Sequence, residues 1–167
     1  VIATTGHTEN EISAIYTAAE SIPLFFSANM SLGVALLVEL AKTTAAALPE
    51  AEIEIIEKHH NRKLDAPSGT AKMLFSAVQD VRKELTPHYG RAGEGKREKN
   101  EVGISSLRMG NVVGIHEVHI NTGNQTLTLK HESGSRAMLA DGAVDAAKFM
   151  VGKGKGLYDM ESILNAN

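Results

Sequence analysis

A short segment in the middle of the chain gathers cationic and hydrogen-bonding residues. It reads KHHNRKLDAPSGTA from residue 58 to residue 71, with two imidazoles, a guanidinium and an ammonium between His59 and Lys63. Gly69 and Thr70 then fall in the first turn of a predicted helix, where backbone N–H groups bind anions, glycine allows close approach and a threonine hydroxyl adds a donor. Histidine exchanges protons near neutral pH. The segment predicts a site that binds a small carboxylate or phosphate and transfers a proton.

Other interpretations of these residues are weaker. A solvated basic loop before an ordinary helix cap explains the charges, but it does not explain the adjacent pair His59 and His60. Neighbouring strand residues point to opposite faces, so this pair is poorly placed to bind one metal ion, as are His116 and His119, and we expect no metal site. Without cysteine, G-x-S-x-G or P-loop spacing, thiolate zinc, a serine hydrolase and a nucleotide-phosphate loop are excluded, and we expect Ser68 to be a helix cap.

Hydrophobic periodicity predicts the elements that position this segment. A βα alternation occupies the start of the chain, with helices over about residues 9–20 and 32–48 and a strand over 22–26. A strand over 52–58 ends at the histidine pair, and an amphipathic helix follows with apolar positions from Ala71 to Leu85. Residues 88–100 are expected to form a long mobile loop, and three strands over 102–108, 112–120 and 125–132 an antiparallel meander with tight turns at 109–111 and 121–124. A last long helix is predicted over 135–150.

The composition restricts the class of protein. The chain has 167 residues, 43% hydrophobic residues, no cysteine and a net charge of −3, which excludes a disulfide scaffold and gives no general footprint for nucleic acid. No apolar run is long enough to span a bilayer and no signal peptide is recognisable, so we expect no membrane or nucleic-acid partner and a cytoplasmic location. Because Val1 stands in place of an initiator methionine and the first residues read like the end of a buried strand, we expect a chain that begins part-way through a longer protein.

Several motifs together resemble the dihydrodipicolinate reductase family, whose members are NAD(P)H-dependent enzymes of the diaminopimelate route to lysine. Residues 57–71 match every fixed position of the family signature E-x-H-H-x-x-K-x-D-A-P-S-G-T-A. Similarity continues through ATTG at residues 3–6, SANMSLGV at 27–34, the glycine and arginine pattern of 89–118, DGAVDAA at 141–147 and GLYDM at 156–160. The resemblance covers essentially the whole chain.

The resemblance implies a fold and a set of domains. The expected fold class is α/β with an α+β substrate domain, in which helices pack on a mixed sheet that follows the last βα units of a truncated Rossmann domain. Residues 1–30 would be the remnant of the dinucleotide-binding domain, 31–135 the substrate-binding and oligomerisation domain, and 136–167 a segment returning to the nucleotide domain. No G-x-G-x-x-G occurs, so the pyrophosphate-binding turn is missing and we expect little activity from this chain alone.

The resemblance also implies roles for individual residues. His59 would donate or accept a proton, Lys63 would donate one, His60 would contact the substrate, and Gly69 with Thr70 would hold a substrate carboxylate. NADPH or NADH would contact Ala3, Thr4, Thr5, Ser27, Ala28, Asn29 and Met30. The family generally has glycine where Ala3 stands, and the added methyl group either crowds the nicotinamide or shifts the loop.

The implied reaction is hydride transfer from NAD(P)H to a cyclic dicarboxylate, 4-hydroxy-tetrahydrodipicolinate or dihydrodipicolinate, giving tetrahydrodipicolinate in a homotetramer. The alternative is a non-catalytic oligomerisation or small-anion-binding module, which would not need His59 and Lys63. The preference between NADH and NADPH is not predicted, because the residue that reads the ribose lies outside the matched segments.

Overall fold

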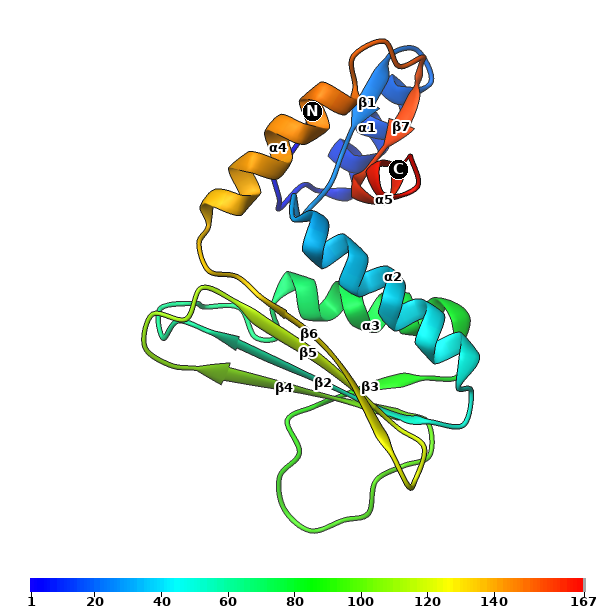
Figure 1. The fold of residues 1–167 in the computed structure, drawn as a ribbon, viewed down its shortest axis with the longest axis vertical. Coiled ribbons are helices and arrows are strands. Elements are labelled where there is room, and N and C mark those ends of the chain that lie inside the picture. The colour runs from blue at the N-terminus through cyan, green and yellow to red at the C-terminus, as the bar shows by residue number, and fades with distance from the viewer. Residues whose placement is uncertain (167) are drawn as a thin grey trace. The chain divides into compact units, whose positions relative to one another are not determined.

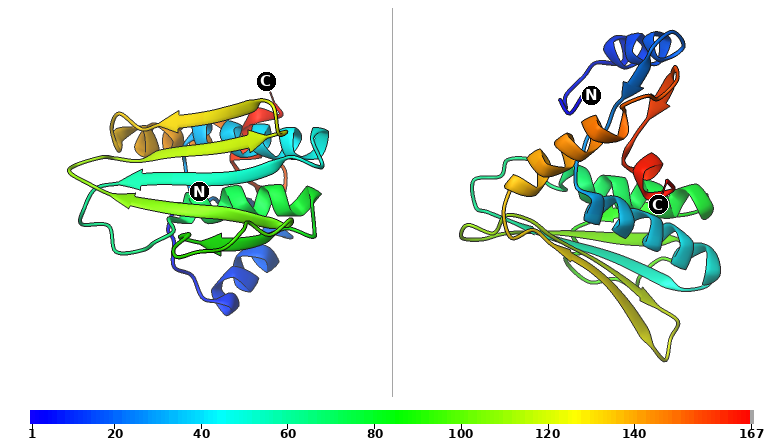
Figure 2. Two further views of the ribbon diagram at one scale, coloured as in Figure 1. Left: turned by 90° about the horizontal axis from the view of Figure 1, so that it is seen from below. Right: turned by 45° about the horizontal axis from the view of Figure 1, so that its top comes forward.

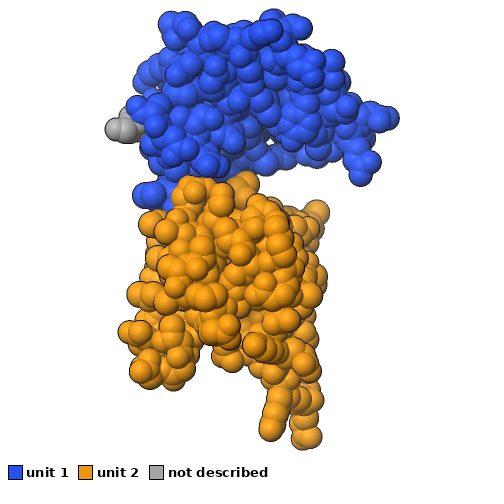
Figure 3. All heavy atoms as spheres, turned by 90° about the vertical axis from the view of Figure 1, so that its right-hand side faces the viewer, with its two compact units in different colours: residues 1–36, 136–167 blue, residues 37–135 orange. Residues whose placement is uncertain are grey.

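The computed structural model describes residues 1–166. The chain divides into two compact units, which Figure 3 colours separately: residues 1–36 with those from 136 onward form the first unit, and residues 37–135 form the second unit. The helices are α1 (Glu9–Ala19), α2 (Leu32–Ala47), α3 (Gly69–Val81), α4 (Ala137–Phe149) and α5 (Met160–Leu164). The strands are β1 (Pro23–Phe25), β2 (Glu52–His59), β3 (Thr86–Tyr89), β4 (Glu101–Arg108), β5 (Ile115–Asn121), β6 (Thr126–Glu132) and β7 (Gly156–Tyr158).

The second unit is built on a five-stranded mixed sheet with the order β3-β4-β2-β5-β6 (Figure 1). The central strand, β2, runs parallel to β4 and antiparallel to β5. β3 extends the sheet parallel to β4, and β6 extends it antiparallel to β5. The expected fold class, a mixed sheet packed by helices, is confirmed.

Burial alternates along β2 because one face of the sheet is covered and the other is not. Ile53, Ile55, Glu57 and His59 are buried, whereas the residues between them are more exposed. The covered face packs against α3 and the part of α2 that lies in the second unit, and Figure 2 shows both helices on this one face. The inner face of β2 therefore carries apolar residues at its start and ionisable residues at its carboxyl end.

The predicted meander is wrong for its first strand. β4 and β5 do not pair with each other, because β2 lies between them and pairs with both. The turn expected at residues 109–111 is therefore not a hairpin, although Gly110 has the positive φ (50°) expected of a tight turn. The second predicted turn does join a hairpin, β5–β6, with Gly123 at φ 96° and a hydrogen bond from Thr122 N to Gln125 O.

Two predicted boundaries also differ from the structure. The expected loop from His88 to Asn100 begins too early, because Thr86–Tyr89 form β3; all four residues are exposed, so no alternation of apolar residues marks this strand. α3 ends at Val81, and the apolar spacing extends to Leu85 because this residue is in the core after the helix has ended.

The first unit has a small core around the parallel pair β1–β7. Phe25, Met30, Ala146 and Met160 are buried together. Gly142 in α4 lies against the backbone of Met30, where an added Cβ would overlap the Met30 carbonyl oxygen. Among the described residues, none of the helices has both the length and the apolar character needed to cross a lipid bilayer.

Candidate active site

The site lies in the second unit, where the parallel strands β2 and β4 end side by side. His59, the last residue of β2, is in register with Arg108, the last residue of β4. The chain segments that follow are tied together, because Met109 N donates to His59 O and Asn61 N donates to Gly110 O. Carboxyl ends of adjacent parallel strands meet at one edge of a sheet, which is a common place for a ligand site in mixed α/β structures.

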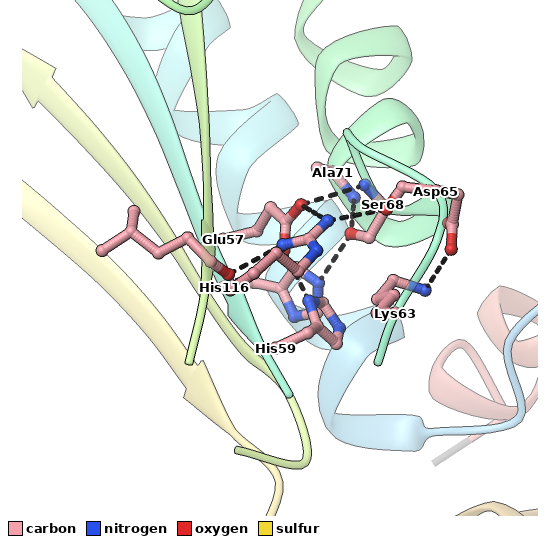
Figure 4. Close-up of polar contacts among 9 residues, drawn as sticks. Glu57, His59, Lys63, Asp65, Ser68, Ala71 and His116 are labelled. Carbon is pink, nitrogen blue, oxygen red and sulfur yellow. Dashed lines mark hydrogen bonds and ion pairs between the residues drawn. The ribbon is translucent and has the colours of Figure 1, made fainter. Parts of the chain in front are cut away.

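A buried carboxylate, Glu57, connects the parts of this site (Figure 4). Its side chain is 0% exposed. Arg108 donates to both carboxylate oxygens, at 2.9 Å from Nη1 to Oε2 and 2.7 Å from Nη2 to Oε1. Ser68 N also donates to Oε1, at 3.2 Å. Burial acts to raise the pKa of Glu57, but the hydrogen bonds from Arg108, Ser106 and His59 outweigh it, and the pKa is lowered.

His59 is held by Glu57 through one ring nitrogen. The distance from His59 Nδ1 to Glu57 Oε2 is 2.5 Å, and the His59 side chain is 11% exposed. Among the described residues, no hydrogen bond is made by the second ring nitrogen, Nε2. Gly114 leaves room for this atom, because a Cβ there would come within 3.2 Å of Nε2. The ring is therefore fixed at Nδ1 and available for proton exchange at Nε2.

His116, on β5, is the inner-face neighbour of Glu57 across the sheet. Its ring packs edge-on to that of His59, with centroids 5.1 Å apart, and its Nε2 lies 3.1 Å from Ser68 Oγ. Burial, with a smaller effect of the nearby His59, lowers the pKa of His116 to about 4, although Glu57 acts in the opposite direction. The pKa of His131, the cross-strand neighbour of His116 on β6, is also lowered by burial. His116 is therefore neutral at pH 7.

The start of α3 completes the site. Ser68 is the N-cap of this helix, as expected, and its side chain accepts a hydrogen bond from Ala71 N at 3.2 Å. Gly69 is exposed in the first turn, where a Cβ would meet no atom within 4 Å, and Thr70 follows it, partly buried. An anion can approach the backbone here without meeting a side chain at Gly69.

Lys63 and His60 lie in the segment between β2 and α3. Lys63 Nζ forms an ion pair with Asp65 Oδ1 at 2.8 Å, and the hydrogen bond from Lys63 lowers the pKa of Asp65. The Lys63 side chain is 22% exposed. His60 is partly buried, and its carbonyl accepts from Lys63 N. The structure brings His59, Lys63 and the start of α3 together around one loop of residues 60–68.

The residues expected to contact a nicotinamide lie together in the first unit. Ile2 and Phe26 form an isolated parallel bridge, so the segments that follow them, Ala3–Thr5 and Ser27–Met30, leave it side by side. Ala3, Thr4, Thr5 and Ala28 are exposed, whereas the Met30 side chain is in the core. Hydrogen bonds from Ser27 Oγ to Asn29 O and from Ser31 N to Asn29 Oδ1 shape the second segment.

The predicted site residues omit the groups that hold the others in place. Glu57 opens the signature motif, but the sequence does not show that it is the bonding partner of His59, Ser68 and Arg108 at once. Arg108 and His116 come from strands whose order was wrongly predicted, so their approach to Glu57 could not be inferred. The alternation of buried positions in β2, which puts Glu57 on the face of Ile53 and Ile55, is the one signal that would have found it.

Comparison with protein families identifies the class to which this fold and site belong. The sequence model described as "Dihydrodipicolinate reductase, C-terminus" matches residues 33–164, so most of the chain is covered. The chain belongs to the dihydrodipicolinate reductase family.

Individual relatives carry the name 4-hydroxy-tetrahydrodipicolinate reductase. That of Alkaliphilus oremlandii is 44% identical over 167 residues, covering 99% of this chain and 69% of the relative. That of Caldanaerobacter subterraneus subsp. tengcongensis is 45% identical over 166 residues, covering 98% of this chain and 66% of the relative. A solved structure described as a dipicolinate-bound dihydrodipicolinate reductase from Paenisporosarcina sp. TG-14 matches with a TM-score of 0.76 and 27% identity, covering 95% of this chain and 61% of the other. The chain spans about two thirds of the length of these relatives.

Proposed function

We propose that this chain provides the substrate-binding and proton-transferring part of a 4-hydroxy-tetrahydrodipicolinate reductase, which converts its cyclic dicarboxylate substrate to tetrahydrodipicolinate by hydride transfer from NAD(P)H. The observation that supports this most directly is the arrangement of His59, Lys63 and the start of α3 around one loop. Relatives with the same name and a structure described as dipicolinate-bound support the chemical class of the ligand.

In this proposal the substrate carboxylate is bound at the first turn of α3. The backbone N–H groups of Gly69 and Thr70 and the Thr70 hydroxyl donate to it, and the positive end of the helix dipole adds a favourable field. Lys63 is partly buried and pairs with Asp65, which is 55% exposed, and Lys63 would leave this partner to bind the substrate. Because Asp65 is exposed, water solvates its carboxylate when the pair opens, which limits the free energy that is lost.

His59 and Lys63 supply the proton that the reduction requires. Negative charge develops on the ring of the substrate as hydride arrives, and an ammonium or imidazolium group stabilises this charge and then neutralises it. His59 Nε2, which makes no hydrogen bond among the described residues, is the atom that would exchange the proton, and His60 would contact the substrate beside it.

The first unit has residues that fit a nicotinamide. The side chains of Ala3, Thr4 and Thr5 are small and exposed, and they lie beside the turn formed by Ser27, Ala28 and Asn29. Small side chains at adjacent carboxyl ends leave backbone groups accessible to a ring. NADH or NADPH bound there would supply hydride.

We also propose that the protein is a homotetramer and acts in the cytoplasm, where nicotinamide cofactors are available to a biosynthetic reductase. The support for assembly is the outer face of the sheet in the second unit, which no helix of that unit covers (Figure 1). Ile56 is partly buried on this face and Leu107 is 40% exposed. Sheet faces of this kind commonly pack against a second sheet.

Binding of pyridine-2,6-dicarboxylate, a flat analogue of the substrate, tests the proposed function. We expect isothermal titration calorimetry to show binding to the chain. We expect the double variant Lys63→Ala, Thr70→Ala to bind at least about 100-fold more weakly, because hydrogen bonds to a charged ligand contribute about 1.5–3 kcal/mol each after exchange with water is taken into account. The matched control is Lys83→Ala, an exposed lysine beyond the other end of α3 that pairs with Asp80. Equal affinities for the chain and the double variant would show that the carboxylate site has been misplaced.

A further inference from the structure

Glu57 has no role in the proposed proton transfer or carboxylate binding, although four hydrogen-bonding contacts converge on its carboxylate. Its Oε1 accepts from Ser68 N and Arg108 Nη2, and its Oε2 accepts from Arg108 Nη1 and faces His59 Nδ1. The carboxylate thus contacts both the imidazole that would exchange the proton and the N-cap of the helix that would bind the substrate. A buried carboxylate is costly to maintain unless donors satisfy its lone pairs, and these contacts supply such donors on both oxygens.

The donors around Glu57 determine which protons are present. A backbone N–H and a guanidinium can only donate, so both carboxylate oxygens act as acceptors, and the positive charge of Arg108, bound to both of them, keeps Glu57 ionised. A contact of 2.5 Å from Oε2 to His59 Nδ1 then requires a proton on Nδ1, because two acceptors would repel each other at this distance. The neutral imidazole therefore has its lone pair on Nε2, the atom beside Gly114.

We propose that Glu57 is a positioning residue that selects the Nδ1–H tautomer of His59 and so directs the proton-exchanging Nε2 toward the substrate. The same carboxylate, through Ser68 N, holds the start of α3 in place, so the proton-exchanging ring and the carboxylate-binding turn share one anchor. The tautomer itself follows from the contacts alone; its value for catalysis rests on the proposed function.

The substitution Glu57→Gln gives a sharp test because an amide has one oxygen and one NH₂ group. If the NH₂ replaced Oε1, it would face two donors, Ser68 N–H and Arg108 Nη2, neither of which can accept. If it replaces Oε2, it faces only one fixed donor, Arg108 Nη1, and the second neighbour, the His59 imidazole, can adapt by accepting at Nδ1 and carrying its proton on Nε2. We therefore expect the variant to reverse the His59 tautomer.

The measurement is ¹H–¹⁵N NMR of the histidine ring nitrogens at about pH 9, well above the ordinary pKa of an imidazole. We expect the Nδ1–H form to predominate at His59 in the wild-type chain, the Nε2–H form in Glu57→Gln, and the Nδ1–H form again in Glu57→Asp, which keeps an acceptor-only carboxylate. The matched control is Glu117→Gln, because Glu117 is also ion-paired, at 3.0 Å to Lys58, but lies on the opposite face of the sheet. This control should leave the His59 tautomer unchanged.

The outcomes separate a positioning role from a purely structural one. A structural role would lower the thermal unfolding midpoint of Glu57→Gln and leave the tautomer as it was, which would overturn the proposal. An Nε2–H form in the wild-type chain would overturn it without any variant, so the test stands even if Glu57→Gln does not fold. Loss of the Nδ1–H form in Glu57→Asp would show that a carboxylate alone does not select the tautomer, and would also overturn it.

The proposed function fails by a different result. If pyridine-2,6-dicarboxylate does not bind the wild-type chain while His59 shows the expected tautomers, then Glu57 positions the ring as inferred and the ligand has been assigned wrongly. If the dicarboxylate binds and Glu57→Gln keeps the wild-type tautomer, the function stands and the role of Glu57 is wrong.

Discussion

His116 should make the second unit lose stability as the pH falls from about 7 to 4. Burial lowers the pKa of this imidazole from 6.5 to about 4 in the folded chain. In that interval the unfolded chain binds the proton and the folded chain does not, so the free energy of unfolding decreases with decreasing pH. The contribution of neutral His116 to the free energy of unfolding is complete at a pH above its pKa in the unfolded chain. It has been lost once the pH is below its pKa in the folded chain.

The magnitude follows from the shift. A pKa difference of one unit corresponds to about 1.4 kcal/mol, so the shift of His116 gives about 3 kcal/mol between pH 7 and pH 4. Such a loss is a large fraction of the stability of a typical domain, which is about 5–15 kcal/mol. Other groups, including Glu57 with its lowered pKa, add to the acid sensitivity, so the prediction concerns a difference between two chains.

The perturbation is His116→Gln, whose amide does not titrate and can still reach Ser68 Oγ, the partner of His116 Nε2 in the wild type. Urea unfolding followed by circular dichroism at several pH values gives the free energy of unfolding of each chain. We expect the free energy of the wild-type chain to fall by about 3 kcal/mol more than that of His116→Gln between pH 7 and pH 4.

The same substitution at His119, on the opposite face of β5 beside Glu117 and Thr128, controls for the loss of one imidazole from the strand. Parallel pH profiles for the wild type and His116→Gln would refute the reasoning, because they would mean that His116 takes up its proton equally well in the folded chain. An equal change in both variants would show that burial of His116 is not the cause.

Two further predictions concern packing and capping. Ser68→Ala should lower the free energy of unfolding by about 1–3 kcal/mol in urea unfolding, since it removes the N-cap of α3 and the hydroxyl beside a buried imidazole, whereas Ser76→Ala, at an exposed site within α3, should have little effect. Gly142→Ala should lower the thermal unfolding midpoint of the first unit, at a cost of about 1–3 kcal/mol, because its Cβ would overlap the Met30 carbonyl. Gly154→Ala, with no atom within 4 Å of the added Cβ, is the control, and an equal effect of the two glycine substitutions would contradict this account.

Periodicity predicts most of the elements because each buries one face. The alternation in β2 and the 3.6-residue spacing of α3 are strong local signals, and both elements are found within a few residues of the predicted bounds. The order of the strands is a different matter. Pairing of β2 with both β4 and β5 depends on contacts between segments far apart in the chain, and nothing local distinguishes this order from a meander. β3 has no buried residue to reveal it.

The residues of the candidate site likewise fall into those that local sequence reveals and those that only the strand order brings in. His59, Lys63, Gly69 and Thr70 come from one continuous segment, so residue types and spacing are enough to group them. Arg108 lies on β4, 51 positions after Glu57 in the chain, and only the register of β4 with β2 brings it to the Glu57 carboxylate. Sequence reasoning therefore finds the groups that would contact a ligand and misses those that hold them in place, because the supporting contacts depend on strand order.

The central position of β2 has a consequence for the route by which the chain folds. The β5–β6 hairpin closes over a short turn and can form early, but β2 is joined to β4 and β5 only after long loops have been closed, and loop-closure entropy makes such pairings slow. Arg108 reaches the Glu57 carboxylate only when the pairing of β2 with β4 is complete. We therefore expect partly folded chains to retain the hairpin but to have no affinity for a dicarboxylate, so ligand affinity would report the completion of folding.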